Sequence, residues 1–216
     1  LYEPPGERLA RKRHLDNVRD VVTHLFHHSR VLRHTYLALC IWGLTTFYAV
    51  WLLQPYWQTQ GIALRDFGYL WGALMLVSAL AGRSAPYLER RLGVAAVLCV
   101  VGLGPALGYF GLAHLGLVAG IAVCFSFFVS RGLGLVVLRD AFNRRLPGRF
   151  RATANSFAHL GFRGAYMLTA PLVGAALDGW GLQATLLLLG GGTVLIFGWL
   201  LVPLMAAVRD ARRPEA

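Results

Sequence analysis

The sequence carries few charged residues for its length, and Lys12 is its single lysine. Only 14% of the 216 residues are charged, and ten of them are acidic. In soluble domains about a quarter of the residues are charged, so this composition excludes an ordinary soluble globular protein. Because Lys12 lies in ARKRH, the sequence has no GxxxxGK[ST] loop to hold phosphates. This excludes a pump whose ATPase belongs to the same chain.

Motifs for catalysis, metal binding and channels are also missing. The sequence contains no HExxH or GxSxG, no NPA pair and no TVGYG filter. The three cysteines, Cys40, Cys99 and Cys124, lie in apolar runs with a spacing that matches no metal site. We therefore expect neither an enzyme nor a metal or cofactor site, and no catalytic residue is assigned.

Apolar residues are abundant and are gathered in blocks. They make up 56% of the chain, whose mean hydropathy is +0.55. A helix needs roughly 20 apolar residues to cross a bilayer. Six blocks of about this size predict an all-α integral membrane protein with six transmembrane helices, at about 35–55, 67–83, 94–112, 116–138, 153–177 and 184–208.

The basic residues alternate strongly between the two sets of loops. Eighteen of the 21 Lys and Arg lie before the first block, after the sixth, or in the second-to-third and fourth-to-fifth loops. The other loops hold only Arg65, while Arg131 and Arg163 lie inside blocks. This asymmetry places both termini in the cytoplasm, and a bacterial inner membrane is the expected location. It also explains the net charge of +11 without nucleic-acid binding.

Three regions follow from this pattern. Residues 1–33 are expected to form a cytoplasmic linker with a basic amphipathic helix, in which Leu25 and Phe26 share an apolar face suited to an anionic leaflet. Residues 34–208 form the six-helix domain, and residues 209–216 form a cytoplasmic tail. Since residue 1 is a leucine, we expect the chain to begin partway into a longer protein.

Three stretches carry a resemblance to a known family. They are GRSAPYLERRLG in the second-to-third loop, RATANS at the start of the fifth block and PLVGAALDGWG at its end. In these stretches the chain resembles the C-terminal half of a major facilitator superfamily (MFS) transporter. The resemblance implies conformational gating by loop residues, namely Gly82, Glu89, Arg90, Arg91, Gly93, Asp140 and Arg151.

The resemblance also implies a function. Such carriers are secondary active transporters in which two six-helix halves rock about a central site, each half built as a 3+3 inverted repeat. It implies transport of a small organic solute by alternating access, driven by an ion gradient, with H⁺ as the expected coupling ion. The partners are then the solute, the bilayer and an N-terminal six-helix half that is missing from this sequence.

Polar residues recur along the fifth block at helical spacing: Asn155, His159, Arg163 and Tyr166. Arg163 lies about ten residues into the block, roughly 15 Å at 1.5 Å per residue, near the midplane. A charge there costs at least about 2.5–3.5 kcal/mol, so this stripe is expected to face a cavity or a partner. Histidine titrates near neutrality, so His159 is either a proton relay or a packed, hydrogen-bonded residue.

Three residues of other blocks complete the expected cavity: Arg131 in the fourth block, and Trp42 and Thr46 in the first. Arg131 either binds solute or reaches the surface or backbone carbonyls. No Asp or Glu lies deep in a block, so the missing half or an anionic group of the solute must supply a partner for the buried arginines. The alternative function is a six-span membrane subunit or scaffold that transports nothing by itself.

Overall fold

The computed structural model describes residues 14–27 and 29–210. These residues form helices joined by short connections, with no β-strand among them. Residues 1–13 of the expected linker region 1–33 and residues 211–216 of the expected tail 209–216 lie outside the described residues. The all-α prediction is confirmed for the part of the chain that the structure describes.

The elements follow one another along the chain as α1 His14–His27, α2 Arg30–Leu37, a π-helical segment Ala38–Trp42, α3 Gly43–Thr59, a 3₁₀ turn Leu64–Asp66, α4 Phe67–His114, α5 Leu117–Arg144, α6 Gly148–Ile196, a second π-helical segment Phe197–Leu201 and α7 Val202–Asp210. Four stretches are long and apolar enough to cross a membrane: Arg30–Thr59, Leu64–His114, Leu117–Arg144 and Gly148–Ala206. Their mean hydropathies lie between 1.7 and 2.1, as expected of an integral membrane protein.

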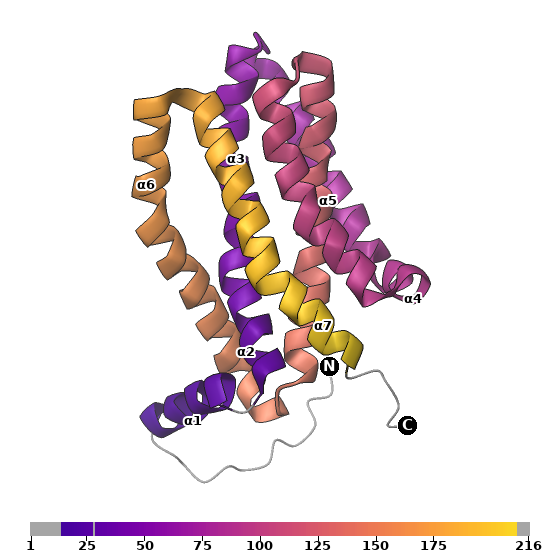
Figure 1. Ribbon diagram of the computed structural model, residues 1–216, viewed down its shortest axis with the longest axis vertical. Coiled ribbons are helices and arrows are strands. Elements are labelled where there is room, and N and C mark those ends of the chain that lie inside the picture. The colour runs from indigo at the N-terminus through magenta and orange to yellow at the C-terminus, as the bar shows by residue number, and fades with distance from the viewer. Residues whose placement is uncertain (1–13, 28, 211–216) are drawn as a thin grey trace.

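Two glycines interrupt the longest helices. Gly93 in α4 has φ 81° and ψ 156°, and Gly181 in α6 has φ 78° and ψ 176°. This backbone region is open to glycine and unfavourable for residues with a Cβ. Figure 1 shows the chain reversing direction within α4 and again within α6. Each of these elements is therefore two helical arms joined at one glycine.

The arms are longer than the apolar blocks. The stretch expected to link residues 83 and 94 is helical up to Gly93, and α5 continues past residue 138 to Arg144. Glu, Arg and Leu, which fill much of residues 88–92, are good helix formers. Charge marks where a helix leaves the apolar region, whereas the helix itself ends at the first residue that adopts a non-helical backbone conformation.

The first arm of α4 packs closely on α5. A Cβ placed on Gly132 would lie 2.1 Å from the carbonyl oxygen of Ser78, so only glycine fits there. The returning arm of α4 is held by a hydrogen bond, because Ser130 Oγ donates to the Val101 carbonyl at 2.6 Å. α5 is thus held between the two arms of α4.

The helix α1 precedes the membrane-length segments, and of the two residues expected on its apolar face Leu25 is buried and Phe26 is not. Val21 and Leu25 are buried against Phe142, Leu146 and Ala154, at the junction of α5 and α6. Phe26, expected on the apolar face, is 38% exposed. In Figure 1, α1 lies across the end of the bundle at which α6 begins.

Candidate functional site

A cavity of about 180 Å³ opens between α5, α6 and the segment that leads into α3. Four of its lining residues are polar or charged: Arg131 and Arg139 from α5, and Asn155 and His159 from α6. The apolar part of the wall consists of Leu39, Gly43, Leu135, Ala158 and Phe162. We call this the outer cavity. Three residues of the predicted site, Arg131, Asn155 and His159, therefore meet in it.

Helical geometry sets the depth of each polar group. Arg139 lies five residues from the end of α5, and Asn155 lies seven residues from the start of α6. At 1.5 Å per residue these are roughly 8 and 10 Å from that end of the bundle, whereas Arg131 lies roughly 20 Å from it. The cavity thus runs from the end of the bundle at which α5 ends and α6 begins, which we call the arginine-rich end, towards the middle of α5.

Three contacts hold the polar wall in place. Arg139 Nη2 lies 3.4 Å from His159 Nε2, and because a guanidinium has no acceptor, the arginine is the donor in this contact. Asn155 Nδ2 donates to Asn143 Oδ1 at 2.7 Å and to the Arg151 carbonyl at 2.8 Å. α5 and α6 are therefore joined by polar contacts along the entrance of the cavity.

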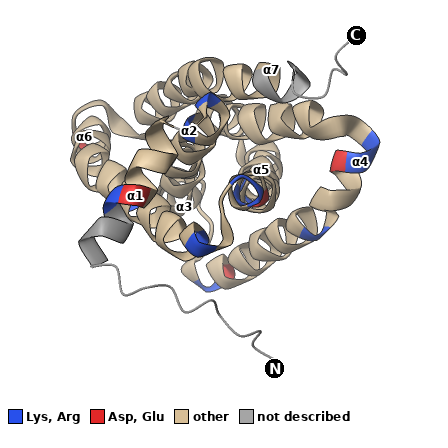
Figure 2. Ribbon diagram, turned by 90° about the horizontal axis from the view of Figure 1, so that it is seen from below, with Lys and Arg blue, Asp and Glu red and all other residues tan. Residues whose placement is uncertain are grey.

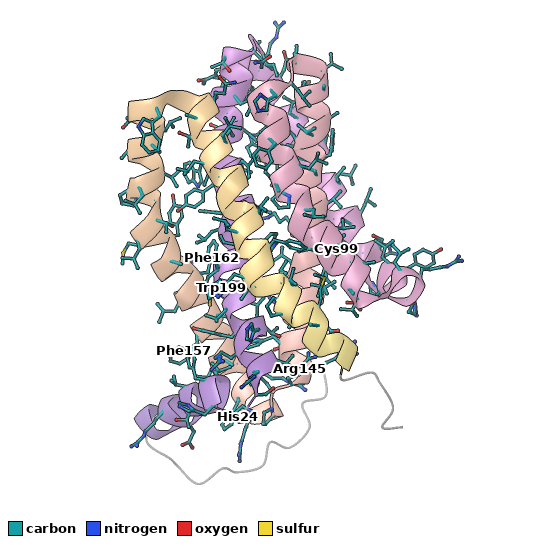
Figure 3. The ribbon with its side chains drawn as sticks, viewed as in Figure 1. His24, Cys99, Arg145, Phe157, Phe162 and Trp199 are labelled. Carbon is teal, nitrogen blue, oxygen red and sulfur yellow. The ribbon has the colours of Figure 1, made fainter. Side chains whose placement is uncertain are left out.

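Phe162 forms the far wall. Figure 3 shows it in the middle of the bundle, between α6 and α3. Its ring packs edge-on against Phe47 with centroids 5.4 Å apart, and a Cβ on Gly43 would lie 3.1 Å from it. Gly43 begins α3, directly after the π-helical segment Ala38–Trp42. Such segments are frequent at functional sites.

A second, smaller cavity of about 60 Å³ shares Arg131 with the first. It is lined by Trp42 and Thr46, as well as by Ser130 and Gly134 of α5. We call this the inner cavity. The structure therefore brings Trp42 and Thr46, predicted from the first block, to the same arginine as Asn155 and His159.

Arg163 and Tyr166 lie apart from these cavity walls. Arg163 is on an exposed face of α6, one helical turn beyond His159. Tyr166 packs on α3, with its ring centroid 4.9 Å from that of Phe47 and 5.7 Å from that of Tyr48. Of the four residues predicted to form one stripe, Asn155 and His159 line the outer cavity.

Among the predicted gating residues, Gly82 and Glu89 lie beside α5, Gly93 lies at a turn and Asp140 pairs within α5. Gly82 approaches α5, because a Cβ on it would lie 3.3 Å from the Gly132 carbonyl oxygen. Gly93 forms the turn of α4. Asp140 pairs with Arg144 at 2.7 Å, and Glu89 lies near enough to act electrostatically on the same arginine.

The other gating residues have local roles. The Arg91 guanidinium lies 5.3 Å from the centre of the Tyr87 ring, and Arg90 is exposed. Arg151 Nε donates to the Leu146 carbonyl at 3.3 Å across the α5–α6 connection. Beside this connection, burial and the charge of Arg144 lower the pKa of Arg145, which donates to the Ala141 carbonyl at 2.7 Å.

Arg139 is the main lining residue that the sequence prediction left out. The hydropathy pattern predicts a loop at Arg139, because the fourth apolar block ends at residue 138. Its position eight residues after Arg131 is a signal that was present, since two residues eight apart lie two turns apart near one helix face. A helix that extends through Arg139 would place Arg131 and Arg139 beside the same neighbouring helix, α6.

Comparisons with known proteins add no family to this picture. A scan against protein-family models, a search of curated proteins and a search of solved structures each return no match for the chain. Within residues 14–27 and 29–210, no group of three or more His, Cys, Asp or Glu side chains is placed to hold a metal ion. The function must therefore be argued from the cavities themselves.

Proposed function

We propose that the chain is the C-terminal six-helix half of an MFS-type secondary transporter. The turns at Gly93 and Gly181 divide α4 and α6 into arms, and this supports six membrane crossings in place of four. The first arm of α4, residues 67–92, is roughly 39 Å long, and its second arm, residues 94–114, roughly 31 Å. Each arm is long enough for a hydrocarbon core of about 30 Å.

The distribution of arginine supports the proposed orientation. Figure 2 looks at the bundle from the end at which α1 lies and shows arginine on α1, at the turn of α4 and at the end of α5. The opposite end has Arg65, whose side chain is 87% exposed. By the positive-inside rule we propose that the end that carries α1 faces the cytoplasm of a bacterial inner membrane, with both termini on that side.

The observation that carries the transport proposal is the outer cavity. Arg131, Arg139, Asn155 and His159 converge on a space of about 180 Å³ within membrane-length helices. A charge in the hydrocarbon region is costly unless it faces a cavity or a partner. Charged and polar groups gathered at such depth mark solute pathways and proton relays. A small organic solute fits the volume.

His159 supports proton coupling. Its Nε2 lies 3.4 Å from Arg139 Nη2 at the wall of the outer cavity, and histidine is a common proton shuttle in proteins. In the proposed carrier, solute entering the cavity competes with His159 for Arg139. The neighbouring pair Asp140–Arg144, with Glu89, forms part of the cytoplasmic gate.

The exposed face of α6 supports a partner half. His159 and Arg163 lie on this face, and both are exposed. In a two-half carrier the N-terminal half covers this face and closes the solute site. We propose that Arg163 contacts the solute or that half, and we expect Arg163→Ala to abolish transport by the complete protein while leaving it folded.

The test is uptake by the full-length protein in proteoliposomes. Small organic anions and cations are offered with and without an imposed pH gradient, to the wild type and to Arg163→Gln. Gradient-driven uptake that the variant loses is the expected result. Absence of uptake in both proteins would refute transport and favour a six-span subunit or scaffold, while equal uptake would refute the role of Arg163.

A further inference from the structure

Trp42 carries a buried hydrogen-bond donor that no acceptor satisfies. The residue is 3% exposed, and its indole Nε1 has no hydrogen-bond partner among the described residues. Indole nitrogen donates and cannot accept. Buried donors without a partner are rare in native proteins, and each calls for an explanation. The cavity that Trp42 lines offers one.

The inner cavity holds two kinds of donor and no acid. Trp42 and Arg131 both line it. The hydroxyls beside them are already engaged as donors, since Thr46 Oγ1 donates to the Gly43 carbonyl at 3.3 Å and Ser130 Oγ to the Val101 carbonyl at 2.6 Å. The lining residues of the inner and outer cavities include no carboxylate. What these walls lack is an anion that accepts hydrogen bonds.

Two carboxylates near the C-terminal end of α5 act on Arg144. Asp140 follows Arg139 in sequence but pairs with Arg144 at 2.7 Å. Glu89 acts on the same Arg144. Arg131 also lies roughly 20 Å from the end of α5, too deep for its guanidinium to reach the cytoplasmic surface easily. Its counter-charge must therefore come from outside the described residues.

We propose that the two cavities together bind a small organic anion, with its carboxylate in the inner cavity. The carboxylate accepts hydrogen bonds from the Arg131 guanidinium and from Trp42 Nε1, and the rest of the molecule occupies the outer cavity beside Arg139, Asn155 and His159. This inference rests on the proposed function and names the class of solute.

The volumes fit this division. The inner cavity of about 60 Å³ corresponds to the share of about two water molecules in the liquid, which suits a carboxylate group. The outer cavity of about 180 Å³ suits the body of a small acid and extends towards the arginine-rich end. A guanidinium binds a carboxylate through two parallel hydrogen bonds, so the planar fork of Arg131 is well suited to the inner position.

Equilibrium binding tests the proposal without any transport step. The purified full-length protein in detergent is heated with a thiol-reactive fluorophore, which labels the buried Cys40 and Cys124 as the protein unfolds. Benzoate, succinate and lactate are each compared with the corresponding amide. A ligand that binds only the folded protein raises the unfolding temperature. We expect stabilisation by at least one acid and not by its amide.

Variants locate the site. Arg131→Gln and Trp42→Phe are expected to weaken binding of the stabilising acid at least tenfold. Trp57→Phe is the matched control, because Trp57 is also buried but belongs to a different part of the core. If Arg131→Gln does not fold, Arg131→Lys keeps the charge, removes the planar fork and is expected to weaken binding.

The outcomes separate this inference from the proposed function. An acid that binds through Arg131 and Trp42 but is not transported supports the anion site and refutes the transport function. Uptake of a neutral or cationic solute without binding of any acid supports transport and overturns the anion site. Equal stabilisation by acids and amides, or full binding by Arg131→Gln and Trp42→Phe, also overturns it.

Discussion

Replacing Gly132 by alanine is expected to separate α5 from the first arm of α4. The added Cβ would lie 2.1 Å from the Ser78 carbonyl oxygen and 3.1 Å from the Ala81 Cβ, whereas ordinary contact is 3.4–4 Å. The obstacle is backbone, which cannot rotate away as a flexible side chain does. The two helices must therefore move apart by about 1 Å and lose packing along their contact.

The magnitude follows from two opposing effects. Overpacking a tight contact costs about 1–3 kcal/mol, and a rigid carbonyl places Gly132→Ala near the upper limit. Alanine recovers about 1 kcal/mol because it is the better helix former. A net loss of about 2 kcal/mol lowers the unfolding temperature by roughly 4–8 °C for a chain of this length.

Gly164→Ala is the matched control for this prediction. Gly164 is helical, and no atom lies within 4 Å of a Cβ placed on it. Its substitution is expected to leave the unfolding temperature unchanged or slightly higher. The fluorophore assay on the buried cysteines measures both variants. Equal unfolding temperatures for Gly132→Ala and Gly164→Ala would refute the close approach of α4 and α5.

Three further substitutions test other parts of the fold. Gly181→Ala should lower stability by about 1–2 kcal/mol because φ is +78° there. Gly179→Ala is the control and should not lower stability, because no atom lies within 4 Å of a Cβ on Gly179. Thermal unfolding of the two variants measures the difference. Leu25→Ala should detach α1 from the bundle, because Leu25 is 1% exposed. Limited proteolysis should then cleave α1 while the bundle stays intact. Unchanged protection of α1 from the protease would contradict its docking. Tyr109→Phe removes the bond from the Tyr109 hydroxyl to the Thr45 carbonyl and should cost about 1 kcal/mol or more; an unchanged unfolding temperature would contradict that bond.

The sequence predicts the helices well because long apolar runs leave few other structures possible in this composition. It predicts the turns less well. Residues 83–93 were expected to form a loop on account of their charge, but they are helical until Gly93, where the backbone turns. Helix ends depend on local backbone conformation, which hydropathy does not report.

The candidate site could be predicted in part for a similar reason. Helical spacing placed Asn155 and His159 on one stripe, and both line the outer cavity together with Arg131. Spacing could not show where that stripe leaves the cavity, so it included Arg163. The unsatisfied Trp42 donor depends on how α5 packs against the π-helical segment, and only a three-dimensional structure reveals it.

The most direct test of the central claim is gradient-driven uptake by proteoliposomes that contain the full-length protein. The comparison is between the wild type, Arg131→Gln and Arg65→Gln. Arg65 provides the same change of charge at the far end of the bundle, where its side chain is 87% exposed. The account predicts uptake of a small organic acid by the wild type and Arg65→Gln, and its loss in Arg131→Gln. Uptake that survives in Arg131→Gln would contradict the solute site, and absence of uptake in all three proteins would contradict transport.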